Sequence, residues 1–139
     1  MNIGLDFHEV IDKFPEIFAT LSNYWLQENH EIHIVTGQER SVIEPKVHAL
    51  NIKFTHFFSI VDWHKGQGTP MYTRSDKKGW WMSRDTWLQS KARYASRAGL
   101  DIHFDDQLDY AKYFPNCCTF IHVKECFDYL VEDGMFMGG

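Results

Sequence analysis

The sequence has little of what extracellular and membrane proteins are built from. Only three of its 139 residues are cysteine, and Cys117 and Cys118 are adjacent, which excludes a framework of paired disulfides. Its apolar runs stay below the roughly 18 residues of a membrane span. Acidic residues, not a basic leader, occupy the first of these runs. We therefore predict a cytoplasmic protein with no membrane partner.

Basic charge is scarce as well. Lysine and arginine number 14 against 19 aspartate and glutamate residues, which gives a net charge of −5. General nucleic-acid binding needs the opposite balance and is not expected. The eight histidines do not occur at the spacing of a zinc site. Aromatic residues, in contrast, make up 16% of the chain and apolar residues 44%, which is ample for the core of one globular domain.

Apolar periodicity predicts an alternation of strands and helices. We expect strands at residues 2–6, 31–36, 54–61, 100–106 and 117–123. We expect helices at 14–28, 41–50, 83–98, 107–114 and 124–132. Such alternation is typical of an α/β fold, a three-layer sandwich with a mostly parallel, Rossmann-like five-stranded sheet. The whole chain, residues 1–139, is then one domain.

Residues 62–82 interrupt the alternation, and we interpret them as a long functional loop or small lid. The segment combines the cations Lys65, Arg74, Lys77 and Lys78 with the aromatic residues Trp63, Tyr72, Trp80 and Trp81. Aromatic rings mixed with cations can stack a base and hold phosphates, which suits a nucleotide or a nucleic-acid end. The same residues equally suit core and lid contacts or a homodimer contact, and the sequence leaves these alternatives open.

Polar residues follow three of the predicted strands. Asp6 ends the first, Thr36 the second, and the pair Asp105 and Asp106 the fourth. The carboxyl ends of parallel strands meet at one edge of the sheet, where ligands bind. A carboxylate there can bind Mg²⁺ or attack phosphorus, and a hydroxyl can hold a phosphate oxygen. Each residue alone also fits a turn or a helix cap, but together they predict a site for a hard cation and an anion.

In order and strand context, over roughly residues 2–123, these residues resemble the haloacid dehalogenase-like (HAD) phosphohydrolase superfamily. Its first motif, an apolar strand followed by DxDx(T/V), is represented by DFHEV at 6–10. Its second motif is matched by Thr36 and its fourth by Asp105 and Asp106. The resemblance implies a Mg²⁺-dependent phosphomonoesterase that acts through an aspartyl-phosphate on a small phosphorylated substrate. The segment between Asp6 and Thr36 is too short to hold a large cap domain.

The resemblance also implies the metal ligands and the nucleophile. Asp6 would be both the nucleophile and a Mg²⁺ ligand, and the backbone carbonyl of His8 would be a second ligand. Asp106 or Asp105 would complete the protein ligands. Because side chains alternate along a strand, only one of this pair is expected to meet the metal.

The phosphoryl group would be held by residues from other elements. Thr36 with Gly37 matches the phosphate-binding position after the second strand. The family also uses a basic residue from the helix before the fourth strand, for which Lys91 is our candidate. Lys77 and Lys78 are its rivals, and Lys78 is also a candidate phosphate ligand.

One position departs from the family pattern in a way that bears on catalysis. The residue two after the nucleophile is usually an aspartate that protonates the leaving group, and here it is His8. An imidazole can act as a general acid and base near neutral pH. The alternative is a catalytically impaired module that binds a nucleotide or a partner protein. A milder departure is Glu9, at a position that the family gives to glycine.

Overall fold

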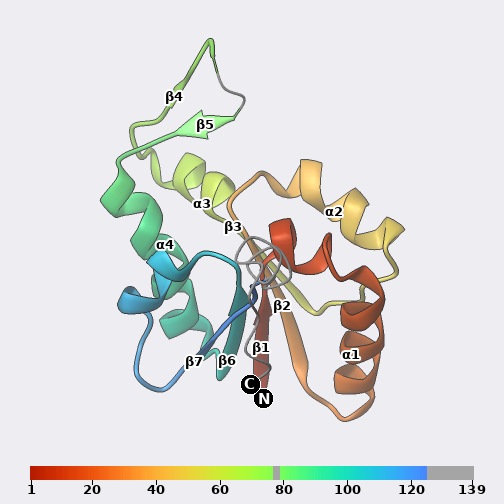
Figure 1. Ribbon diagram of the computed structural model, residues 1–139. Coiled ribbons are helices and arrows are strands. Elements are labelled where there is room, and N and C mark those ends of the chain that lie inside the picture. The colour runs from red at the N-terminus through yellow and green to blue at the C-terminus, as the bar shows by residue number, and fades with distance from the viewer. Residues whose placement is uncertain (77–78, 125–139) are drawn as a thin grey trace, which may run out of the picture.

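The computed structural model describes residues 1–76 and 79–124, over which strands and helices alternate (Figure 1). Five parallel strands form one sheet in the order β3-β2-β1-β6-β7. They are β1 (Asn2–Leu5), β2 (Glu31–Thr36), β3 (His56–Ser59), β6 (Ile102–Asp105) and β7 (Thr119–His122). The predicted α/β sandwich with a parallel, Rossmann-like sheet of five strands is therefore confirmed.

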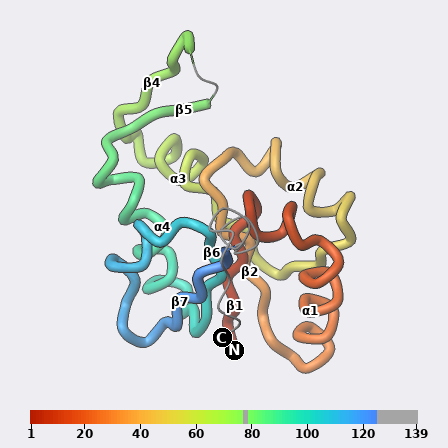
Figure 2. Tube along the Cα trace, in the orientation of Figure 1, coloured from red at the N-terminus to blue at the C-terminus, as the bar shows by residue number. Residues whose placement is uncertain are grey.

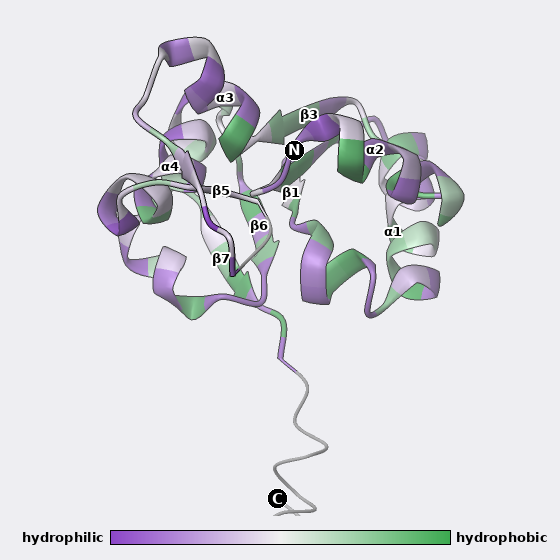
Figure 3. Cartoon of the chain, turned by 90° about the horizontal axis from the view of Figure 1, so that it is seen from above, coloured by the Kyte–Doolittle hydropathy of each residue, from purple (hydrophilic) through white to green (hydrophobic). Residues whose placement is uncertain are grey.

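Helices cover both faces of this sheet. One side carries α1 (Pro15–Gln27) and α2 (Arg40–Ala49), and the other carries α4 (Arg84–Ala98) and the 3-10 turn η2 (Leu108–Tyr113) (Figure 3). Each side has its own apolar cluster, built around Leu5, Ile34 and Phe18 in the first case and around Val35, Leu88 and Ala95 in the second. Because both faces are covered, the central strands β1 and β2 are buried over most of their length.

The order of the strands reverses beside β1. The chain first moves outward from β1 to β2 and β3, then crosses back to place β6 on the other side of β1. The carboxyl ends of β1 and β6 therefore lie at the point where the strand order switches. In open parallel sheets this is where ligands bind.

The predicted strand at 54–61 and loop at 62–82 are corrected by a helix that lies across their boundary. β3 ends at Ser59, whose hydroxyl accepts a hydrogen bond from the backbone N–H of Asp62 (3.1 Å) and caps α3 (Ile60–Gln67). Gly68, with a φ of 71°, ends this helix. These are ordinary cap residues, and the aromatic and β-branched run before them hid the signal.

Beyond α3 the chain forms a short antiparallel hairpin of β4 (Tyr72–Thr73) and β5 (Trp80–Trp81). The hairpin projects above the carboxyl ends of the strands, in green at the top of Figures 1 and 2. It leads directly into α4, which returns along the sheet to β6. The predicted terminal helix at 124–132 lies, apart from residue 124, outside the described residues. Among the helices that the structure describes, none has the length and apolar character to cross a membrane.

His33 is buried near the amino-terminal end of the sheet, away from the switch point. Its Nδ1 lies 2.6 Å from the Tyr94 hydroxyl, its Nε2 lies 3.0 Å from Asn2 Oδ1, and its ring stacks on His56 with centroids 4.3 Å apart. The two rings are only 7° from parallel, and both ring nitrogens of His33 already have a polar neighbour within 3.0 Å. Burial, and then the neighbouring His56, lowers the pKa of His33 to about 4.

We expect the protein to lose stability as the pH falls from about 6.5 to 4. The unfolded chain protonates His33 below pH 6.5, whereas the folded chain keeps it neutral until about pH 4, so acid favours unfolding by on the order of 2–3 kcal/mol. Denaturant unfolding at pH 7 and pH 4.5 measures this loss. It should shrink in His33→Gln but persist in His48→Gln, whose side chain is exposed. An unchanged loss in His33→Gln would contradict the assignment to His33.

Candidate active site

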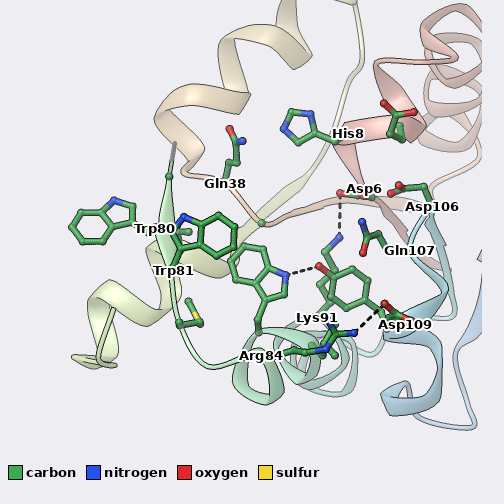
Figure 4. A pocket seen from close by; sticks show the side chains of 18 residues that line it. Asp6, His8, Gln38, Trp80, Trp81, Arg84, Lys91, Asp106, Gln107 and Asp109 are labelled. Carbon is green, nitrogen blue, oxygen red and sulfur yellow. Dashed lines mark hydrogen bonds and ion pairs between the residues drawn. The ribbon is translucent and has the colours of Figure 1, made fainter. Parts of the chain in front are cut away.

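The acidic residues predicted from the sequence meet at the switch point. Continuing the pairing of β1 with β6 puts Asp6 level with Asp105, and the Asp6 N–H donates to the Phe104 carbonyl (3.0 Å). One carboxylate oxygen from each of Asp6, Asp105 and Asp106 lies within 4.8 Å of the other two. They lie beside a cavity of about 590 Å³ whose lining includes Asp6 and Asp106 (Figure 4).

Lys91 lies between two of these carboxylates. It reaches in from α4, its side chain is only 2% exposed, and its Nζ lies 3.1 Å from Asp6 Oδ1 and 2.7 Å from Asp105 Oδ2. Burial alone would lower the pKa of Lys91, but the two carboxylates raise it above its usual value, so the ammonium stays charged. The same ammonium lies 4.5 Å from the centre of the Tyr110 ring.

Asp105 is held by protein groups on both of its oxygens. Oδ2 accepts from Lys91 and from His103 Nε2 (2.9 Å), and Oδ1 accepts from the backbone N–H of Gln107 (3.0 Å). Burial would raise the pKa of Asp105, but Lys91 and His103 outweigh it and hold that pKa below its usual range. Asp106 is partly exposed and lines the cavity, whereas Asp105 does not. The pair therefore divides as strand alternation predicts, with Asp105 orienting Lys91 and Asp106 facing the cavity.

His103 reaches Asp105 only because the neighbouring strand carries a glycine. A Cβ on Gly4 would lie 2.6 Å from His103 Nδ1 and 2.9 Å from Leu100 Cδ1. The ring therefore occupies the space that any other side chain at position 4 would need. This residue was not predicted from the sequence, although its place two residues before Asp105 puts it on the same face of β6.

Asp6 is buried and accepts the backbone N–H of Phe7 on Oδ1 (2.8 Å). Burial raises its pKa, Lys91 lowers it by less, and the carboxylate of Asp105 raises it further. Two buried carboxylates thus share one ammonium, which leaves an excess of negative charge at the edge of the cavity. Asp6 and Asp106 offer carboxylate oxygens there, the ligand type that Mg²⁺ prefers, so the residues present fit this ion.

Thr36 lies one residue beyond the level of Asp6 on the adjacent strand. It is fully buried, and its Oγ1 has no hydrogen-bond partner among the residues that the structure describes. An unpaired buried hydroxyl is costly, so a ligand that bound it would stabilise the fold. Thr36 does not itself line the cavity, but Gly37 does, and a Cβ there would lie 2.6 Å from the Trp87 ring. Glycine at 37 therefore allows Trp87 to form one wall.

The turn η1 (Phe7–Ile11) places the two departures from the family pattern at the cavity. His8 Nδ1 lies 3.5 Å from Asp12 Oδ2, and its buried Nε2 has no hydrogen-bond partner within residues 1–76 and 79–124. Glu9 has a φ of 61°, in the left-handed region that favours glycine, and its N–H donates to Asp12 Oδ1 (2.6 Å). Glu9 thus adopts a backbone conformation that costs a residue with a side chain more than it costs glycine.

Lys77 and Lys78, the other candidate basic residues, lie outside the described residues. The cavity has an aromatic side that the sequence predicted only in part. Trp80 and Trp81 come from the hairpin, Trp87 from α4 and Tyr110 from η2. Trp87 lies one helical turn before Lys91, which is the spacing that puts both on one face of α4.

No protein-family model matches this chain, and comparison with curated proteins and with solved structures gives no significant match.

Proposed function

We propose that the chain is a Mg²⁺-dependent phosphomonoesterase of the kind found among HAD-like phosphohydrolases. The observation that carries the proposal is the buried Lys91 ammonium between Asp6 and Asp105, with Asp106 facing the cavity. Phosphoryl transfer requires a positioned nucleophile and neutralisation of the charge on the transferring group. Mg²⁺, when bound by Asp6, Asp106 and the His8 carbonyl, would supply most of that neutralisation.

In the first step a carboxylate oxygen of Asp6 bonds to phosphorus, and the bond from phosphorus to the leaving oxygen breaks. The imidazolium of His8 donates its proton to that oxygen, and an alcohol is released. Gly37, which lines the cavity, would hold a phosphoryl oxygen through its backbone N–H, with the unpaired Thr36 hydroxyl directly behind it, and Lys91 keeps Asp6 oriented. In the second step water attacks phosphorus, His8 takes the proton, and Asp6 is released together with inorganic phosphate.

The second candidate function is a binding module that has lost catalysis. It is favoured by His8 itself, because an imidazolium beside a divalent cation is electrostatically unfavourable where the family places an aspartate. Such a module would keep the acidic edge and the aromatic cavity and would bind a nucleotide or a partner protein without hydrolysis.

Hydrolysis of a set of phosphomonoesters with Mg²⁺ or EDTA distinguishes the two functions. The phosphatase predicts turnover that requires Mg²⁺ and falls at least 10⁴-fold in Asp6→Asn, because the nucleophile is gone. Asp109→Asn is the matched control, since it removes an exposed carboxylate from the lining of the same cavity. Absence of turnover in a folded protein that still binds Mg²⁺ in calorimetry would contradict the phosphatase and favour the binding module.

A further inference from the structure

The cavity has two chemically distinct ends. Asp6, Lys91 and Asp106 supply charge at one end, and four of the eighteen lining residues supply aromatic rings, namely Trp80, Trp81, Trp87 and Tyr110. In Figure 4 the indole of Trp81 points toward the middle of the cavity, on the side of Lys91 and Asp6, and Trp80 lies farther out. A small polyol phosphate would leave the aromatic end unused.

These rings are fixed in place by contacts of their own. Trp87 donates its Nε1–H to the Tyr110 hydroxyl (2.7 Å) and lies against Gly37. The Arg74 guanidinium lies 5.0 Å from the Trp81 ring centre and is itself held by Asp76 through two hydrogen bonds of 2.9 and 2.6 Å. Arg74 does not line the cavity, so it supports Trp81 from outside it. A ring held in this way loses little freedom when a ligand stacks on it.

Polar groups suited to the edge of a base lie between the two ends. Gln38 and Gln107 both line the cavity, and each side-chain amide offers donors and an acceptor. Neither side-chain amide forms a hydrogen bond within the part of the chain that the structure describes. The volume of about 590 Å³ lies within the usual range for a small-molecule site.

We infer that the aromatic end is a subsite for the base of a nucleoside monophosphate, whose phosphate lies at Asp6 and Lys91. The inference rests on the proposed function and names its substrate class. Stacking on Trp81 would supply affinity, and the amides of Gln38 and Gln107 would bind the edge of the base. A single phenyl ring, as in phosphotyrosine, would fill only part of the space between three indoles and a phenol.

The test compares adenosine 5′-monophosphate with ribose 5-phosphate, which carries a hydroxyl in place of the base, and with phosphotyrosine. We expect kcat/KM for the nucleotide to exceed that for ribose 5-phosphate by about 10- to 100-fold. This ratio should fall at least tenfold in Trp81→Ala and be largely retained in Trp81→Phe. Trp63→Ala is the control, because Trp63 is exposed outside this cavity.

Binding to the Asp6→Asn variant, measured by calorimetry, separates the two proposals. Turnover without preference for the base would leave the phosphatase intact and overturn the base subsite. A different result would overturn the phosphatase and support the subsite. In it the natural chain shows no turnover, but the nucleotide binds at least tenfold tighter than ribose 5-phosphate and this preference depends on Trp81. A preference for phosphotyrosine, equal binding with and without the base, or dissociation of a homodimer by Trp81→Ala without loss of base preference, would each overturn the role of Trp81 as the base platform.

Discussion

Replacing Lys91 by methionine is expected to lower kcat/KM by about 10²- to 10³-fold and to destabilise the fold by on the order of 3–5 kcal/mol. Methionine has nearly the volume of the lysine stem, so the loss comes from charge and not from a cavity. Without the ammonium, the carboxylates of Asp6 and Asp105 face each other in a buried site. Activity assays with Mg²⁺ measure the first effect, and denaturant unfolding in EDTA measures the second.

Arg93→Met is the control, since Arg93 is an exposed residue of the same helix. A double-mutant cycle sharpens the test. Asp6→Asn removes one of the two facing charges, so Lys91→Met should destabilise the Asp6→Asn background by at least about 1 kcal/mol less than it destabilises the natural chain. Equal losses in both backgrounds would mean that Lys91 contributes by contact area alone, and the charge argument would fail.

The sequence carried enough information to place this lysine near the acidic edge. Strands buried on both faces are recognisable as apolar runs, and parallel topology brings their carboxyl ends together. The sequence alone therefore predicts Asp6, Asp105 and Asp106 at one edge, and the structure brings them together there. Lys91 followed from the rise of a helix beside a strand and the length of its side chain.

What the sequence could not supply were contacts between distant segments. His103 lies against Asp105 because Gly4, in a strand about a hundred residues earlier, leaves room for the ring. Trp87 forms a cavity wall because Gly37, just after the end of β2, leaves room for the indole ring. A pattern along one strand or helix predicts the face on which a residue lies. It does not predict that the residue opposite, in an adjacent element, is a glycine that leaves room for the side chain.

The helix α3 was missed for a local reason. The run FTHFFSIV has the β-branched and aromatic composition of a strand up to residue 61, while Ser59 already begins a helix. Propensity and capping gave opposite answers at the same residues, and contacts of α3 with α4 favour the helix. His64 is one such contact, since its Nε2 lies 2.8 Å from the Ser90 hydroxyl.

Replacing Asp6 by asparagine is expected to abolish hydrolysis and yet to stabilise the protein in EDTA. Asparagine keeps an oxygen to accept the Phe7 N–H and leaves Lys91 with Asp105 as a balanced pair. Burial and the charge of Asp105 raise the pKa of Asp6, which means that its ionised form opposes folding near neutral pH. A neutral replacement should therefore add about 1–2 kcal/mol, or about 3–6 °C in Tm.

If Mg²⁺ binds at the acidic edge, it should make the natural chain more stable than Asp6→Asn, which is the reverse of the order expected in EDTA. Mg²⁺ should raise the Tm of the natural chain, because binding to the folded state alone adds to stability, and should have little effect on Asp6→Asn. Asp109→Asn, which removes an exposed carboxylate paired with Arg84, should respond to Mg²⁺ as the natural chain does. If the Asp6→Asn protein is less stable in EDTA than the natural chain, the Asp6 carboxylate stabilises the metal-free fold, and the argument fails. Thermal unfolding of the three proteins with and without Mg²⁺ thus tests whether the excess negative charge around Asp6 binds this ion.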